Sequence, residues 1–419
     1  MGDIVLEIAK KAKECTSFIA TANTSEKNRV LEGIAKNLVK NADEIIKENK
    51  KDISRSKKEG ISESLLDRLT LDRKRIEKIA GSISQVIEFT DPVGEVIFGY
   101  NLPNGIRLKN IRVPLGVIGI IYEARPNVTI DAAVLCLKAG NCVILRGSSS
   151  ALSTNIKLAG IMRDTLRENG FPQDIIQIIP QAEREHAVRL MQLREYVDVL
   201  VPRGGKELIG SVVDNSKVPV IETGIGNCHL YVDDKLEGIN YGVIEDIVVN
   251  SKTQRPSVCN AAEKLLVHSK VAAELLPKIA NKLKGLGVKL LGGSKAGKIL
   301  KGISQMEEDD WYEEFLDLKI GIKVVDSLED AVTHINRYGS HHTDAIITSS
   351  YRNANYFTSL VDSSTVNVNA STRFTDGGEF GMGAEIGIST QKLHWRGPMG
   401  LREITTNKFL VYGNGQIRK

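Results

Sequence analysis

The chain has 419 residues, of which 42% are hydrophobic and 26% charged, so it can bury a core of normal size without disulfides or metals. Its net charge of +4 is small and dispersed, which argues against a nucleic-acid-binding protein. Five widely spaced cysteines argue against a disulfide framework, and no Cys/His cluster has the spacing of a zinc site. The first residues lack a signal-peptide core, and no apolar run approaches the roughly 18 residues of a membrane span. We therefore expect a cytoplasmic globular protein that binds no nucleic acid, membrane or metal.

The first 90 residues are predicted to be helical, because apolar residues recur there at intervals of three and four. Examples are Val30, Leu31, Ile34, Leu38, Ile45 and Ile46. Alternating charges over 47–59 indicate a solvated helix face rather than a binding patch. From 94 to 116 the pattern changes to short apolar-polar alternations around Pro103-Asn104-Gly105. This predicts a β-hairpin, because Asn and Gly both tolerate positive φ.

From Gly116 onward, short β-branched runs alternate with amphipathic stretches of ten or more residues. The predicted strands are 116–122, 142–147, 175–180, 197–202 and 219–222, with helices at 128–140, 153–169, 183–194 and 205–216. A second series of strands follows at 264–268, 320–326, 343–349 and 364–369. The pattern predicts two α/β domains with parallel sheets, joined near Glu222–Gly226. The tail at 407–418 is predicted to pair with the hairpin, and exposed strands at both places would suit an oligomer interface.

Cys259 lies in NSKTQRPSVCNAAEKLLVH (250–268), where a loop leads into a predicted short helix and a strand. A helix N-terminus and cations such as Lys252 or Arg255 would lower the pKa of this thiol. Taken alone, however, a cysteine is more often a small buried filler. Glu222 ends a predicted strand and opens the turn ETGIGN, where a carboxylate would face a ligand at the edge of a parallel sheet. An ordinary solvated turn residue explains Glu222 equally well.

Three basic loops follow predicted strands in the first α/β series. VILRGSSSALSTN (143–155) carries Arg146, Ser148 and Ser149, and VPRGGKEL (201–208) carries Arg203, Gly204 and Gly205. Both loops would suit an anion, although Ser and Gly before a helix are also ordinary helix starts. The third loop, EARPNV (123–128), carries Arg125 and Asn127. The Asn127 amide could donate to a developing oxyanion, and a turn-forming Pro-Asn pair is the alternative.

In their order along the chain, these segments resemble the aldehyde dehydrogenase superfamily. The order is PLGVIGII, LKAGNCVILR, NGFPQDIIQIIP, the Glu222 turn, Cys259 and EEFLDLKIGI (313–322). Glu222 and Cys259 are 259 − 222 = 37 positions apart, which is similar to the interval between the family's general base and its nucleophile. Glu314 stands where the family has the acidic residue that holds the nicotinamide ribose.

Seven further segments resemble the branch of this superfamily that reduces L-glutamyl 5-phosphate to glutamate 5-semialdehyde in proline biosynthesis. They are YEARPNVTIDAAVLCLKAGN, LVPRGGKELI, VPVIETGIGNCH, RPSVCNAAE, VNASTRF, GGEFGMGAEIGIST and HWRGPMGL. The resemblance implies that the Cys259 thiolate attacks the acyl phosphate and that NADPH reduces the resulting thioester. It also implies other copies of the chain, and the preceding glutamate kinase, as partners.

The resemblance extends to the binding residues. Arg146 corresponds to the family lysine on the cofactor ribose, and the acidic residue of many NAD-users falls near Ser149 here, which favours NADP(H). The implied cofactor-binding residues are Arg146, Ser148, Ser149, Gly204, Gly205 and Glu314. The candidates for the substrate's phosphate and carboxylate are Arg125, Arg203, Arg255 and Arg373, because guanidinium groups match both anions. The oxyanion donor is Asn127 by residue type or Arg125 by position, and Glu222 would transfer a proton or position the substrate.

The implied fold class is an aldehyde dehydrogenase-like α/β protein with two Rossmann-type parallel-sheet domains and a small β oligomerisation element. Residues 1–93 and 114–224 would bind NADPH, residues 225–404 would carry the nucleophile, and residues 94–113 and 405–419 would form the oligomerisation element. Two alternatives are another oxidoreductase of the superfamily and an inactive interaction protein on the same scaffold. Retention of Cys259, Glu222 and Asn127 argues against the second.

Overall fold

The computed structural model describes residues 3–61, 63–382 and 384–418. Two compact units are present: unit 1 comprises Met1–Glu222, Gly381–Gly387 and Met399–Lys419, and unit 2 comprises Thr223–Phe380 and Ile388–Pro398. The predicted domain limits at residues 1 and 419, and Gly383 of the glycine-rich segment, lie outside the described residues. The predicted junction at 224/225 lies two residues beyond the division at 222/223, and 381–387 and 399–404 group with unit 1 rather than with the second series. The functions assigned to these domains stay predictions.

Unit 1 begins with the predicted helices. They are α1 (Ile4–Glu14), α2 (Thr16–Thr21), α3 (Thr24–Lys40), α4 (Ala42–Lys58), α5 (Glu63–Leu69) and α6 (Arg73–Glu88). The start of α3 is fixed by a capping box in which Asn23 and Glu26 accept each other's backbone N–H groups. The apolar residues singled out in the sequence, from Val30 to Ile45, are fully buried. Most charged residues of 47–59 are exposed as predicted, but Asp52 is buried together with the polar Asn49 and Ser56.

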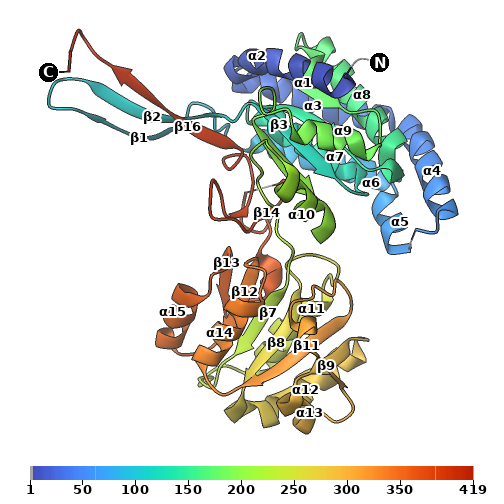
Figure 1. Cartoon of the computed structure of the whole chain (residues 1–419), viewed down its shortest axis with the longest axis vertical. Helices are drawn as coiled ribbons and strands as arrows, with labels where there is room; N and C mark the ends of the chain where they lie inside the picture. Colours follow the sequence, from blue (N-terminus) through green and yellow to red (C-terminus); the bar gives the residue numbers. More distant parts are fainter. Residues whose placement is uncertain (1–2, 62, 383, 419) are drawn as a thin grey trace. The chain divides into compact units, whose positions relative to one another are not determined.

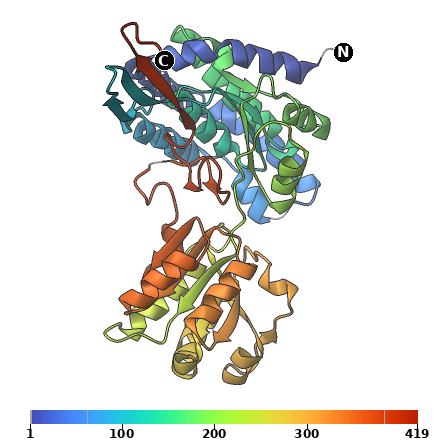
Figure 2. The same cartoon turned by 60° about the vertical axis from the view of Figure 1, so that its left-hand side comes forward.

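A parallel sheet of four strands in the order β5-β4-β3-β6 forms the centre of unit 1. Its strands are β3 (Val117–Tyr122), β4 (Cys142–Arg146), β5 (Ile176–Ile178) and β6 (Val199–Arg203). The connecting helices are α7 (Pro126–Lys138), α8 (Leu152–Glu168) and α9 (Arg184–Met191), and α10 (Lys206–Asn215) follows β6. Every residue of β3 is buried, which requires cover on both faces because successive side chains point to opposite sides. Figures 1 and 2 show these helices packed around the sheet.

A separate antiparallel sheet of three strands projects from the helical body of unit 1 (Figure 1). It consists of β1 (Val96–Asn101), β2 (Arg107–Pro114) and β16 (Thr405–Tyr412), with β2 in the middle. The Leu102 carbonyl accepts from Gly105 N–H, and Gly105 has a φ of +85°, as the Asn-Gly turn predicted. β16 pairs with β2 in antiparallel register, from Thr405 opposite Pro114 to Tyr412 opposite Arg107, which confirms the predicted pairing of the tail with the hairpin.

Unit 2 contains a seven-stranded parallel sheet in the order β10-β9-β11-β8-β7-β12-β13. The strands are β7 (Cys228–Val232), β8 (Ala262–His268), β9 (Lys289–Gly292), β10 (Ser304–Gln305), β11 (Lys319–Val325), β12 (Thr343–Ile347) and β13 (Thr365–Val368). The helices are α11 (Tyr241–Thr253), α12 (Ser269–Gly285), α13 (Ser294–Ile299), α14 (Leu328–Tyr338) and α15 (Tyr351–Leu360). A short hairpin, β14 (Ile388–Ser389) and β15 (Gly397–Pro398), completes the unit.

The predicted strands are present with one exception. Residues 219–222 form no strand, and only an isolated bridge joins Val220 to Leu200. The strand of unit 2 that follows the junction is instead β7, which the sequence analysis did not predict. No helix among the described residues has the length and apolarity needed to cross a membrane.

Candidate functional site

The predicted cofactor and oxyanion residues of unit 1 follow the carboxyl ends of adjacent strands. β3 lies between β4 and β6, so the chain leaves β3 toward one neighbour and returns beside it on the other. Ligands of open α/β sheets bind at the carboxyl edge where the strand order reverses in this way. Arg125 and Asn127 follow β3, Ser148 and Ser149 follow β4, and Gly204 and Gly205 follow β6. The topology therefore gathers these residues along one edge of the sheet.

Arg146 and Ser148 are held in place by neighbouring loops. Arg146 is partly buried and its Nη2 donates to the Ala182 carbonyl at 2.7 Å, while its buried Nε has no hydrogen-bond partner. Burial lowers the pKa of Arg146. Ser148 Oγ accepts from the Ala124 N–H at 3.1 Å and contacts Ser150 Oγ at 2.7 Å. Ser149 is exposed, with no carboxylate side chain at its position.

The Gly204-Gly205 turn is shaped by a carboxylate that the sequence analysis did not single out. Glu123 Oε2 accepts from the Gly205 N–H at 3.0 Å. A β-carbon at Gly204 would lie 2.5 Å from the same oxygen and 2.7 Å from Leu208 Cδ2. A side chain at position 204 would therefore displace the flexible ends of Glu123 and Leu208.

Asn127 is oriented by Asp131, one turn further along α7. Asn127 Nδ2 donates to Asp131 Oδ2 at 3.0 Å, which leaves the second amide hydrogen for another acceptor. Burial raises the pKa of Asp131 to about 6, although the Asn127 hydrogen bond and the Arg203 charge lower it. Arg125 is the residue that precedes the first turn of α7. Both oxyanion candidates thus lie at the start of the same helix.

In unit 2 the amino ends of three neighbouring parallel strands meet at one edge. β7 begins at Cys228, β8 at Ala262 and β11 at Lys319, and β8 lies between the other two. The segments that lead into these strands carry Gly226, Cys259 and Glu314 respectively. Residues separated by up to 88 positions are brought together in this way.

Cys259 lies in the loop between α11 and β8 and is partly exposed, whereas the other four cysteines are buried. Burial raises the pKa of each of these four thiols, so they remain protonated and inert at neutral pH. The predicted helix after Cys259 is absent, because the chain enters β8 at Ala262. The expected acidification by a helix N-terminus was therefore wrong.

Gly226 connects the Cys259 loop to Glu314. A β-carbon at Gly226 would lie 1.5 Å from the Cys259 carbonyl oxygen, so the two backbones are in direct contact. The Gly226 N–H donates to Glu314 Oε1 at 2.6 Å. Burial raises the pKa of Glu314, while this hydrogen bond lowers it. Cys228 Sγ also donates to the Cys259 carbonyl, at 3.1 Å.

The cations around Cys259 differ in their exposure to solvent. Lys252, one of the two predicted cations, is fully buried and pairs with Glu263 at 3.0 Å. Arg255 is exposed. Burial lowers the pKa of Arg373, while the nearby Asp376 and Cys259 raise it and Arg255 lowers it. Arg255 and Arg373 therefore share the electrostatic environment of Cys259, whereas Arg125 and Arg203 belong to unit 1.

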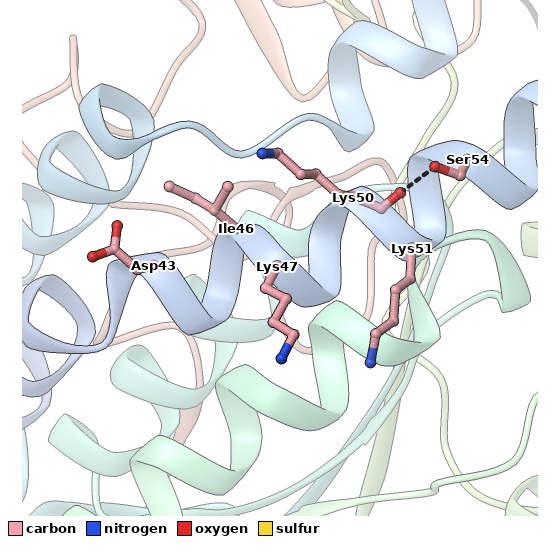
Figure 3. A pocket seen from close by; sticks show the side chains of 6 residues that line it. All are labelled: Asp43, Ile46, Lys47, Lys50, Lys51 and Ser54. Atoms are coloured by element: carbon pink, nitrogen blue, oxygen red, sulfur yellow. Dashed lines mark hydrogen bonds between the residues drawn. The ribbon is translucent and has the colours of Figure 1, made fainter.

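Glu222, a predicted catalytic residue, is the last residue of the continuous part of unit 1 and is partly exposed. Figure 3 shows a surface pocket along α4 with the lysines Lys47, Lys50 and Lys51. This pocket contains no predicted site residue, in agreement with a solvated helix face. Within 3–61, 63–382 and 384–418, no group of His, Cys, Asp or Glu has the arrangement of a metal site.

Asp131 gives a test of the unit 1 geometry. Its pKa of about 6 lies above the ordinary pKa of an aspartate, so the folded chain binds a proton at Asp131 more tightly than the unfolded chain. This contribution to stability is present at low pH and is lost as pH rises through about 6. We expect the unfolding free energy of the wild type, minus that of Asp131→Asn, to fall between about pH 4 and pH 6 and to level off above. Urea denaturation across this range measures the difference, and a flat difference would contradict the burial of Asp131.

Comparison with known proteins agrees with this geometry. The model of the aldehyde dehydrogenase family matches residues 3–295. Gamma-glutamyl phosphate reductases from Clostridium perfringens and Dictyoglomus thermophilum are 54% and 52% identical to the chain, over 100% and 99% of both sequences. The crystal structure of gamma-glutamyl phosphate reductase from Thermotoga maritima has a TM-score of 0.97 and 46% identity, and covers 100% of both chains. The predicted aldehyde dehydrogenase-like fold is thereby confirmed. The chain belongs to the aldehyde dehydrogenase family and, within it, to the gamma-glutamyl phosphate reductases.

Proposed function

We propose that this chain reduces L-glutamyl 5-phosphate to L-glutamate 5-semialdehyde and phosphate with NADPH, as a step of proline biosynthesis. Full-length identity of 54% to a protein named gamma-glutamyl phosphate reductase supports the reaction. The observation that carries the mechanism is the partly exposed Cys259, placed in a loop beside Gly226 and Glu314 while the other four thiols are buried.

In the proposed mechanism the Cys259 thiolate attacks the acyl carbon of the substrate. The bond from carbon to phosphate oxygen breaks, inorganic phosphate leaves, and a thioester to Cys259 forms. NADPH, when bound, supplies the hydride that reduces this thioester. The thiohemiacetal at Cys259 then collapses, releases the aldehyde and restores the thiolate. Asn127 is the candidate donor to the oxyanion, because Asp131 occupies one amide hydrogen and orients the other.

The substrate carries a phosphate, a carboxylate and an ammonium group. Arg255 and Arg373 are the candidates of unit 2. Their link to the nucleophile is electrostatic, because the charges of Cys259 and Arg255 both shift the pKa of Arg373. Arg125 and Arg203 are the candidates of unit 1. Glu222 is assigned proton transfer or substrate positioning, because a reductive reaction needs no base to activate water.

The residues of unit 1 fit a phosphorylated dinucleotide. The Gly205 N–H donates to Glu123, and the buried Nε of Arg146 has no hydrogen-bond partner among the described residues. Ser149 offers a hydroxyl where a carboxylate would repel a 2′-phosphate. We assign the cofactor to Arg146, Ser148, Ser149, Gly204 and Gly205, and the nicotinamide ribose to Glu314.

The projecting sheet of unit 1 is the proposed contact between copies of the chain. Phe98 and Phe409 are 46% and 53% exposed although their rings are 6.0 Å apart. The outer strands β1 and β16 each leave an unpaired edge within the described part of the chain. Open strand edges and exposed apolar side chains of this kind are typical of a surface that packs against another chain. The glutamate kinase that makes the substrate is proposed as a second partner.

The nucleophile is tested by Cys259→Ser. The variant is expected to fold and bind NADPH but to lose more than about 10³-fold in kcat, because the hydroxyl is not ionised at neutral pH. Cys15→Ala, which alters a buried thiol, serves as the matched control and should keep its activity. The assay follows NADP⁺ reduction by glutamate semialdehyde with and without phosphate. Dependence on phosphate separates the proposed reaction from hydrolytic aldehyde oxidation, and substantial activity of Cys259→Ser would contradict the assignment.

Cofactor choice is tested by Ser149→Glu. The new carboxylate would repel the 2′-phosphate, so NADPH affinity should fall at least about tenfold relative to NADH affinity. Ser153→Glu in the following helix controls for added charge. Fluorescence titration with both cofactors measures the ratio, and an unchanged ratio would place the 2′-phosphate elsewhere.

The proposed interface is tested by the double variant Phe98→Asp/Phe409→Asp. Charges on the projecting sheet should convert an oligomer to monomers, because they would be buried without partners. Tyr351→Asp, at an 83% exposed tyrosine of α15, is the control. Light scattering after size exclusion gives the masses, and an unchanged oligomer would move the interface to another surface.

A further inference from the structure

Lys264, the third residue of β8, is a buried cation that the mechanism does not use. Its side chain is fully buried, and the neighbouring Glu263 is engaged by Lys252 instead. In the described part of the chain, no carboxylate lies within ion-pair distance of Lys264 Nζ. Burial lowers the pKa of Lys264 to about 7. In place of an ion pair, its amine donates hydrogen bonds to oxygens on other segments.

The hydrogen bonds of Lys264 join two segments that are far apart in the sequence. Its Nζ donates to Asn227 Oδ1 at 2.9 Å and to the Glu313 carbonyl at 2.7 Å. The amine also lies 4.0 Å from the centre of the Phe315 ring. One side chain therefore fixes the residues on both sides of Glu314 and the residue after Gly226.

Asn227 completes this arrangement with its amide nitrogen. Asn227 Nδ2 donates to the Trp311 and Tyr338 carbonyls, each at 2.7 Å, and its backbone N–H donates to Ser340 Oγ at 2.8 Å. The side chain is 1% exposed. Asn227 can therefore shift only if several buried hydrogen bonds break together.

The two segments tied by Lys264 are the ones that meet beside the nucleophile. Gly226 lies against the Cys259 carbonyl, and its N–H donates to Glu314. We propose that Lys264 is a positioning residue, which sets Gly226 and Glu314 against the Cys259 loop through Asn227 and the Glu313 carbonyl. The inference rests on the proposed function in one respect, the role of Glu314 in holding the cofactor.

Lys264→Met tests the proposal, because methionine keeps most of the length and apolar contact of lysine but donates no hydrogen bond. In the whole protein, amide hydrogen exchange should accelerate about tenfold in peptides spanning 223–229 and 312–317, and stay unchanged in the rest of unit 2. The Kd for NADPH should rise about tenfold, with a smaller effect on kcat. Lys264→Arg, which keeps donors, should restore much of both properties.

Lys138→Met is the matched control. Lys138 is a fully buried lysine of unit 1, and its Nζ likewise donates to an amide oxygen, Asn28 Oδ1 at 2.6 Å, and to a backbone carbonyl, that of Ile87 at 3.0 Å. If Lys264 had a merely structural role, Lys264→Met would accelerate exchange evenly across unit 2 and leave the NADPH Kd unchanged, and this result would overturn the proposal. Exchange at the wild-type rate in both peptides of Lys264→Met would also overturn it. If NADPH binds neither the wild type nor Lys264→Met, but exchange in the two peptides still differs between them, the proposed cofactor is wrong and the positioning role stands. If Lys264→Met does not fold, Lys264→Gln, which is too short to reach both oxygens, replaces it with the same expectations.

Discussion

The contact between Gly226 and the Cys259 carbonyl is the constraint on which the candidate site of unit 2 depends. No side chain fits at this point, because a β-carbon would lie 1.5 Å from a backbone oxygen that cannot move aside. The close approach lets one N–H reach Glu314 while the same residue supports the nucleophile loop. The candidate thiol and the candidate cofactor carboxylate are thus coupled through a single peptide unit, and a shift of either segment is transmitted to the other.

Sheet topology explains why this contact arises in unit 2 and why the candidate cofactor loops lie together in unit 1. In unit 1 the binding candidates follow the carboxyl ends of β3, β4 and β6, the usual position for a dinucleotide. In unit 2 the candidate nucleophile and the candidate ribose carboxylate lie at the amino edge of the sheet, ahead of β8 and β11. Buried polar side chains of β8 support that edge. Glu263 pairs with Lys252, and Lys264 donates to Asn227 and to the Glu313 carbonyl.

Much of this fold was predictable because its strands are continuous β-branched runs and its helices have regular apolar spacing. The hairpin at Gly105 and the paired tail follow from local turn chemistry and strand alternation. The strand predicted at 219–222 failed because PVIE has the composition of a strand but only Val220 finds a bridge partner. Likewise, the helix expected after Cys259 failed because the chain enters β8 within three residues.

The sequence suggests candidate reactive residues more readily than the residues that hold them in place. Cys259 and Glu314 were proposed through resemblance, whereas Glu123, Asn227 and Lys264 act through contacts with residues distant in the sequence. Asp131 lies one helical turn after Asn127 and is recognisable from spacing alone. The sequence does not reveal that the amine of a lysine in a strand donates to an amide oxygen and to a backbone carbonyl oxygen on two other segments. Such roles depend on tertiary packing, which composition and periodicity do not encode.

In the proposed mechanism, Cys259 carries the acyl group during turnover. The most direct measurement is mass spectrometry of the protein after incubation with L-glutamyl 5-phosphate in the absence of NADPH, followed by acid quenching and digestion. We expect one glutamyl group on the peptide that contains Cys259, removed by hydroxylamine and lost on addition of NADPH. A glutamyl group on another residue, or turnover with no acylated Cys259, would contradict it.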